Sequence, residues 1–205
     1  MNRPKQLQWT GWGVVVLFLL TAVLLVWFGP EERTLGDGIK SVYVHVGLIW
    51  TGLAGFGVAA LLGAVVAFGK RESLFAWLLT ASRVGLLFYF AGFAASTVSS
   101  KINWGAVFWQ EPRMATAVNM LTVAIIVQVL TMLLPQKRLV GALHTLYFIV
   151  LLWANASTRL VLHPDNPIGS SNATGIRFTF LAVFVLIAGA AAWGAYLWQR
   201  RTVEK

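Results

Sequence analysis

Three histidines, His45, His144 and His163, are the side chains of this sequence that could bind a metal ion or a macrocyclic iron through a neutral imidazole nitrogen. Cysteine is absent from the 205 residues, which excludes disulfides, thiolate ligands and cysteine nucleophiles. An isolated histidine in an apolar protein is more often an interfacial or hydrogen-bonded residue than a ligand. Whether two of the three can act together depends on the elements that carry them.

Six apolar runs dominate the chain, at residues 9–28, 42–68, 74–98, 115–134, 139–156 and 178–198. Hydrophobic residues make up 58% of the sequence and charged residues 11%, and the mean hydropathy of +0.74 is far from that of a soluble domain. Each run is close to or above the roughly 20 residues that cross a bilayer. We therefore predict an all-α, polytopic integral membrane protein with six transmembrane helices, forming a single membrane domain over residues 1–205.

The basic residues divide unevenly between the two sides of these spans. Nine basic and two acidic residues fall on the side of the termini, for a net charge of +7, whereas six basic and five acidic residues fall on the other side, for a net charge of +1. Because positive charge near short loops stays inside the cell, both termini are predicted to be cytoplasmic. The basic balance reflects topology and anionic lipid rather than nucleic acid. The first run is longer than a signal-peptide core and is expected to be retained.

The three histidines are predicted to lie at different depths. His45 lies about one turn inside the second span from its outer end, and His163 lies in the outer connection just past the fifth span. His144 begins the fifth span near the cytoplasmic surface. At 1.5 Å per helical residue, His144 should lie about 20 Å or more from the outer pair. Only His45 and His163 are predicted to converge on one ligand.

The segment 101–114, KINWGAVFWQEPRM, places aromatic and charged side chains on the same outer side as His45 and His163. Haem demands this mixture, because its macrocycle packs against apolar faces, its iron takes axial histidines and its propionates pair with cations. The candidates are Trp50, Trp104, Phe108 and Trp109 for the faces, and Lys101, Arg113 and Arg159 for the propionates. The alternative is an interfacial aromatic belt without a cofactor, and the residue types alone favour neither.

Two segments carry a family resemblance. YVHVGLIW, residues 43–50, is similar to the histidine-containing start of the second span in the haem-handling protein C of bacterial cytochrome c maturation (CcmC). NWGAVFWQEPRMAT, residues 103–116, resembles that family's outer tryptophan-rich WWD segment, and the SRVGLLFYF between them fits its third span. The resemblance covers roughly residues 42–126. The WWD segment is degenerate, because Val107, Phe108 and Gln110 stand where the family has tryptophans and Glu111 stands where it has aspartate.

The resemblance implies a six-span protein of the bacterial inner membrane, not an enzyme, that holds b-type haem non-covalently at its outer face. It implies transfer of that haem to a periplasmic haem chaperone, together with other membrane subunits of a maturation complex. The implied site residues are His45 and His163 as axial ligands, Trp50, Trp104, Phe108 and Trp109 as the platform, and Arg113 and Arg159 as propionate partners. The alternative is a structural or accessory subunit of a larger membrane complex that uses this scaffold without haem. An electron-transferring cytochrome b is disfavoured, because His144 has no histidine near it.

Two local features lead to further predictions. Arg83 lies about ten residues into the third span, where a charge is costly, and every acid of the chain lies outside the six runs. Carbonyls and hydroxyls such as those of Thr80 and Ser82, an acid of a partner subunit or a buried ligand could satisfy it. In the WWD-like segment, the spacing of Trp104 and Phe108 predicts a short interfacial helix that Pro112 ends.

Overall fold

The computed structural model describes residues 5–69, 71–158, 168–169 and 171–203, and every regular element in them is helical. The elements are α1 (Lys5–Trp27), α2 (Ile39–Phe68), the 3-10 helix η1 (Glu72–Leu74), α3 (Phe75–Trp104), α4 (Pro112–Leu133), α5 (Lys137–Ser157) and α6 (Thr174–Val203). An isolated bridge between Glu32 and Gly36 is the only strand-type pairing within these described ranges. The all-α prediction is confirmed.

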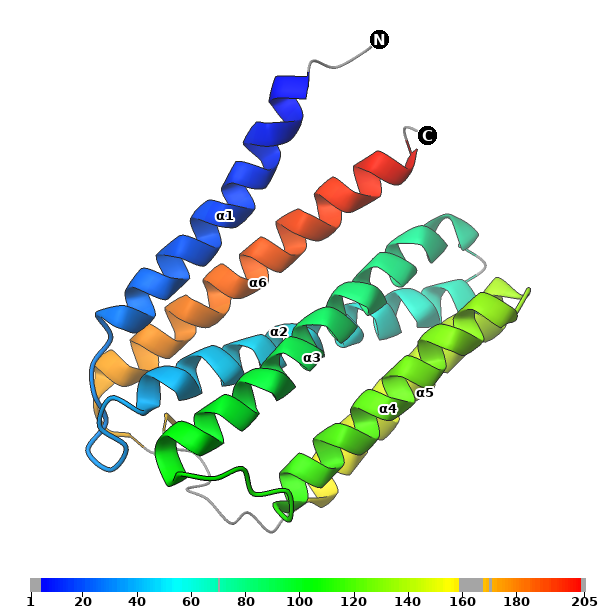
Figure 1. Cartoon of the computed structure of the whole chain (residues 1–205). Coiled ribbons are helices and arrows are strands. Elements are labelled where there is room, and N and C mark those ends of the chain that lie inside the picture. Colours follow the sequence, from blue (N-terminus) through cyan, green and yellow to red (C-terminus); the bar gives the residue numbers. More distant parts are fainter. Residues whose placement is uncertain (1–4, 70, 159–167, 170, 204–205) are drawn as a thin grey trace.

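The helices lie in three adjacent pairs, α1 with α6, α2 with α3, and α4 with α5 (Figure 1). Helix α2 joins the pairs, because it also packs against α5 and α6. Both ends of the chain lie at one end of the bundle, which we call the terminal end (Figure 1). The opposite end carries residues 28–38 and 105–111, the last turn of α5 and the first turn of α6, and we call it the long-loop end.

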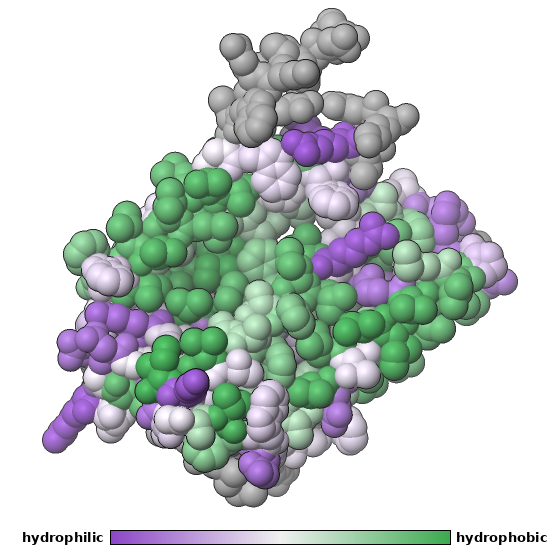
Figure 2. Space-filling view, in the orientation of Figure 1, coloured by the Kyte–Doolittle hydropathy of each residue, from purple (hydrophilic) through white to green (hydrophobic). Residues whose placement is uncertain are grey.

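Five helices, α2 to α6, are long and apolar enough to cross a membrane. Large hydrophobic side chains are exposed along all of them, as is expected of surfaces that face lipid. Figure 2 shows that hydrophobic residues also cover most of the middle of one face of the molecule. These observations indicate a multi-pass membrane protein. Helix α1 has a shorter apolar stretch, Gly11–Trp27, within the described residues, so the sixth span stays a prediction.

Glycines allow α2 to approach its neighbours at backbone distance. A Cβ atom at Gly52 would lie 2.5 Å from the backbone nitrogen of Tyr89 in α3. A Cβ atom at Gly63 would lie 2.5 Å from the carbonyl oxygen of Gly141 in α5. Both distances are too short for any larger residue, so the small residues of the second span serve helix packing, as their spacing predicts.

A buried polar cluster connects α3, α4 and α5 in the half of the bundle nearer the terminal end. His144 is 2% exposed, and its Nδ1 and Nε2 atoms lie 3.1 Å from the Ser82 and Thr131 hydroxyls respectively. The Gln128 amide donates to the Ser82 hydroxyl at 2.6 Å. We call these four residues the His144 cluster. Because its two ring nitrogens are hydrogen-bonded to side chains of α3 and α4, His144 connects α5 to both helices.

Candidate functional site

A cavity of about 920 Å³ opens at the long-loop end and reaches down between the helices to Leu53 and Tyr89. Side chains of α2, α3, α4, α5 and α6 line it together with residues of the connections, and we call it the long-loop cavity. Five of the predicted site residues line it, namely His45, Trp50, Trp104, Phe108 and Arg113. The structure therefore brings together residues that are separated by up to 68 positions in the chain.

His45 lies in the second turn of α2 and faces the cavity. Its Nδ1 atom lies 3.3 Å from the Ser41 carbonyl oxygen, one helical turn earlier. When Nδ1 carries the proton and donates it to this carbonyl, the lone pair resides on Nε2. A histidine that binds a metal usually has this tautomer, because a hydrogen bond from the other ring nitrogen fixes the ring. The local arrangement of His45 is thus suitable for an axial ligand.

Asn103 fixes the end of α3 against the start of α2, directly before Trp104. Its side-chain amide lies 2.9 Å from the Ser99 carbonyl oxygen and 3.1 Å from the Ser41 hydroxyl. The Ser41 hydroxyl in turn lies 2.8 Å from the hydroxyl of Ser99. Because these contacts join the helix turns that carry His45 and Trp104, they hold the two predicted site residues in one wall of the cavity.

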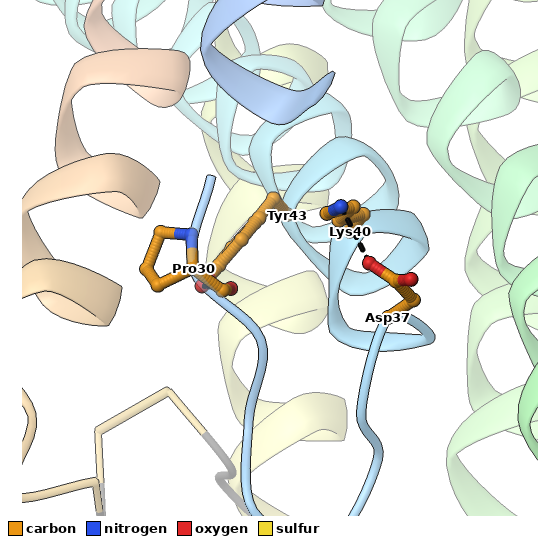
Figure 3. Close-up of polar contacts among 4 residues, drawn as sticks. All are labelled: Pro30, Asp37, Lys40 and Tyr43. Carbon is orange, nitrogen blue, oxygen red and sulfur yellow. Dashed lines mark hydrogen bonds and ion pairs between the residues drawn. The ribbon is translucent and has the colours of Figure 1, made fainter. Parts of the chain in front are cut away.

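The connection between α1 and α2 is fixed to the first turns of α2 (Figure 3). The hydroxyl of Tyr43, which is fully buried, donates to the Pro30 carbonyl at 3.3 Å, and Lys40 pairs with Asp37 at 2.5 Å. Within the same connection, the hydroxyl of Thr34 and two backbone N–H groups donate to the Glu32 carboxylate, which lowers its pKa. One of these N–H groups belongs to Leu35, which lines the cavity.

Trp50 forms part of the cavity wall that α6 completes. Its ring meets Phe180 edge-on at 5.1 Å and Phe184 at 5.7 Å, measured between ring centroids. Edge-to-face contacts of this kind hold an aromatic ring in one orientation. The Trp50 side chain is still 48% exposed, so one part of it is accessible from the cavity and the lipid.

The WWD-like segment does not form the predicted interfacial helix. Trp104 is the last residue of α3, and Gly105 ends that helix in the left-handed conformation, at φ 77°. Residues 105–111 are an irregular connection with a turn at 109–110. Pro112 restricts Glu111 to extended geometry, as predicted, but it begins α4 and does not end a helix. The prediction was wrong because Gly105 ends the helix between the two aromatic residues.

The aromatic residues of this segment separate into two groups. Trp104 and Phe108 line the cavity and are 37% and 44% exposed. Trp109 is outside the lining and is 61% exposed. A tryptophan exposed at the end of a membrane bundle is typical of an interfacial anchor. Of the three aromatic residues, Trp104 and Phe108 are therefore the two that a ligand in the cavity could contact.

The cavity lining includes two charged residues that were not predicted as site residues, Glu111 and Arg177. Arg113 lines the cavity as predicted, and Arg177 of α6 joins it while donating to the Gly169 carbonyl at 2.8 Å. Glu111 also lines it and is 6% exposed. Arg177 could have been recognised, because it is one of the few outer cations next to the start of a span. Two guanidinium groups at the cavity suit a ligand with carboxylates.

Two predicted site residues, His163 and Arg159, lie outside the described residues. Lys101, the third cation considered, is exposed at the end of α3 and is not part of the lining. Within the described ranges, no group of three or more His, Asp or Glu side chains could hold a bare metal ion. A second axial ligand from His163 stays a prediction.

The contrast between these aromatic residues gives a direct test. Trp104→Ala and Phe108→Ala should each weaken haem affinity by about 5-fold to 30-fold, because each removes an apolar face worth about 1–2 kcal/mol. Trp109→Ala should change the affinity by less than about 2-fold. Haem titration of the three purified variants measures the difference. Equal losses from all three variants would assign the segment to general membrane anchoring.

No protein-family model matches this sequence, and no curated protein matches it.

Proposed function

We propose that this chain binds b-type haem non-covalently in the long-loop cavity. The observation that carries the proposal is that His45 lies in the same cavity as Trp104, Phe108 and Arg113. A macrocycle needs apolar walls, an imidazole for its iron and cations for its two propionates, and the lining supplies each. The cavity volume of about 920 Å³ is at the upper end of the roughly 300–1,000 Å³ of small-molecule and cofactor sites.

The role of the bound haem is inferred from where the cavity opens. It lies at the long-loop end, among the ends of the five helices that line it, so a ligand there need not cross the bundle to leave. The proposed role is presentation of haem to a periplasmic haem chaperone, as the resemblance to CcmC implies, with no covalent chemistry by the chain itself. The haem propionates would be held by Arg113, with Arg159 from the sequence and Arg177 from the lining as further partners.

The proposal includes six spans in the bacterial inner membrane, with both termini in the cytoplasm. The basic residues Lys137, Arg138, Arg200 and Arg201 support this orientation, because all lie at the terminal end. The long-loop cavity would then face the periplasm.

Reporter fusions test this orientation. A reporter fused after Lys205 should lie in the cytoplasm, and reporters inserted near Trp109 and Ser171 should lie outside. The reason is that the side of the termini has a net charge of +7 and the opposite side has a net charge of +1. Paired fusions to alkaline phosphatase and green fluorescent protein at each site give opposite readouts. A cytoplasmic signal at Trp109 would remove the haem-delivery proposal, since a periplasmic chaperone could not reach the cavity.

Haem transfer tests the proposed function. The purified protein is loaded with haem in nanodiscs and mixed with excess apomyoglobin, which has a distinct Soret spectrum. The expected result is transfer of most of the haem within minutes, because a presenting protein must release its ligand. Retention of the haem against excess apomyoglobin would instead assign the protein a permanent cofactor and contradict the presenting role.

A second candidate function is that of a structural or accessory subunit without haem. The observation that favours it is Arg83, the ninth residue of α3, which is exposed and suits contact with a partner subunit. Haem titration separates the two functions.

A further inference from the structure

Arg83 lies on a single exposed stripe that runs along α3. The stripe consists of Ala76, Arg83, Leu87, Phe90, Ala94 and Val98, all of them exposed. From Arg83 onward its members recur every three or four residues, and Ala76 lies about two turns before Arg83 on the same face. The opposite face of the helix, with Leu78, Gly85 and Ser99, is buried, and Gly85 packs against the backbone of Phe56 in α2. We call the exposed set the Arg83 stripe. It is the part of α3 that points away from the bundle.

The depth of Arg83 places it in the apolar part of the helix. Glu72, at the terminal end, is exposed and pairs with Lys137 at 2.9 Å, which marks a level in contact with water. Arg83 lies 11 residues further along, about 16 Å at 1.5 Å per residue. That distance exceeds the length of an arginine side chain. Its neighbours on the stripe, Leu87 and Phe90, are 61% and 53% exposed, so Arg83 stands on an exposed apolar surface.

Within the described part of the chain, Arg83 makes no hydrogen bond or ion pair to another side chain. The two hydroxyls considered for it are engaged elsewhere: that of Thr80 bonds the Gln199 side chain at 2.8 Å, and that of Ser82 belongs to the His144 cluster. The acids of the chain all lie outside the six apolar runs. A guanidinium in lipid without a partner is costly, and such residues usually pair inside an assembly.

We propose that the Arg83 stripe binds a transmembrane helix of a different protein, and that this helix carries an aspartate or glutamate at the depth of Arg83. The argument is charge complementarity, since a carboxylate can form two parallel hydrogen bonds with a guanidinium. A second copy of this chain does not supply that carboxylate, because its acids lie outside the spans. Ala76 and Ala94 flank Arg83 and Leu87 and leave room for close contact. The interface is independent of haem binding.

A designed peptide tests the proposed chemistry. Two otherwise identical Leu/Ala transmembrane peptides carry either glutamate or glutamine at their centre, and fluorescence energy transfer in bilayers measures their binding to the full chain. We expect the glutamate peptide to bind at least 5-fold more tightly than the glutamine peptide. Arg83→Leu should remove the difference. Because position 83 faces outward, this variant should fold, which circular dichroism verifies.

A charge reversal and a crosslink provide the matched controls. Arg83→Glu should reverse the preference, so that a peptide with a central lysine binds more tightly than one with glutamate. The control is Leu146→Glu on the exposed side of α5, which keeps Arg83 and should leave the preference for the glutamate peptide intact. Equal binding of the glutamate and glutamine peptides would overturn the proposal. Efficient disulfide crosslinking between copies carrying Leu87→Cys would also overturn it, because it would show that the stripe is covered by a second copy.

Discussion

Replacing His45 with alanine is expected to abolish the Soret band of the haem complex or to weaken haem binding by at least about 10-fold. The reason is that His45 is the one histidine of the described residues that lines the long-loop cavity. Loss of the imidazole removes an iron ligand while leaving the walls formed by Trp50, Trp104 and Phe108 in place. A spectrum that only shifts would indicate that the second ligand, predicted to be His163, still holds the iron. His163→Ala should produce a loss of similar size.

Rescue and a distant histidine control this experiment. Added imidazole should restore a six-coordinate spectrum to a His45→Gly variant, because the free ligand can occupy the space of the lost side chain. Substitution of His144 should leave the spectrum of the folded protein nearly unchanged, since that residue is outside the cavity lining. Equal spectral losses from all three histidine variants, with folding intact, would show that the assignment of the ligands is wrong.

The His144→Ala variant should instead be among the least stable single variants of this protein. The substitution opens a cavity at a residue that is 2% exposed and leaves the Ser82, Gln128 and Thr131 side chains with fewer hydrogen bonds. Loss of a buried polar network of this size costs about 2–4 kcal/mol, because the remaining polar groups stay away from water. The helix pair α4 and α5 would then be held less firmly against α3.

Thermal unfolding in one fixed detergent, followed by circular dichroism, measures this loss. A matched control is Leu146→Ala, two residues away on the exposed side of α5, where the side chain is 58% exposed and the change should be small. His144→Gln should recover part of the stability, because an amide can both donate and accept hydrogen bonds. A His144→Ala variant as stable as Leu146→Ala would mean that the cluster contributes little.

The helical architecture was predictable from the sequence because apolar length and the roughly 20-residue requirement of the bilayer determine it almost alone. The same reasoning placed His45 and the WWD-like segment on one side of the protein. The cavity between them was not predictable, because it depends on how α2, α3 and α6 cross. Gly52 and Gly63 indicate close approach of helices, but they do not tell which neighbours approach.

The errors and omissions at the site have local physical causes. The short helix was predicted from the spacing of Trp104 and Phe108, but Gly105 ends α3 between them. Arg177 was counted only for its charge, although its place beside the start of the sixth apolar run marked it as a candidate; that the first turn of α6 reaches the cavity is a tertiary property. The His144 cluster could not be predicted either, because its four members come from three helices and the pairing of those helices is a tertiary property.

Haem titration of the purified wild-type chain is the direct test of haem binding in the long-loop cavity. We expect a Soret band that saturates at one haem per chain, shifts on reduction and persists after detergent exchange. The band should be much weaker in the Ala117→Trp variant, which places a large side chain in the cavity lining. A folded wild-type protein that develops no Soret band, or one whose band is equally strong with the cavity filled, would contradict the account.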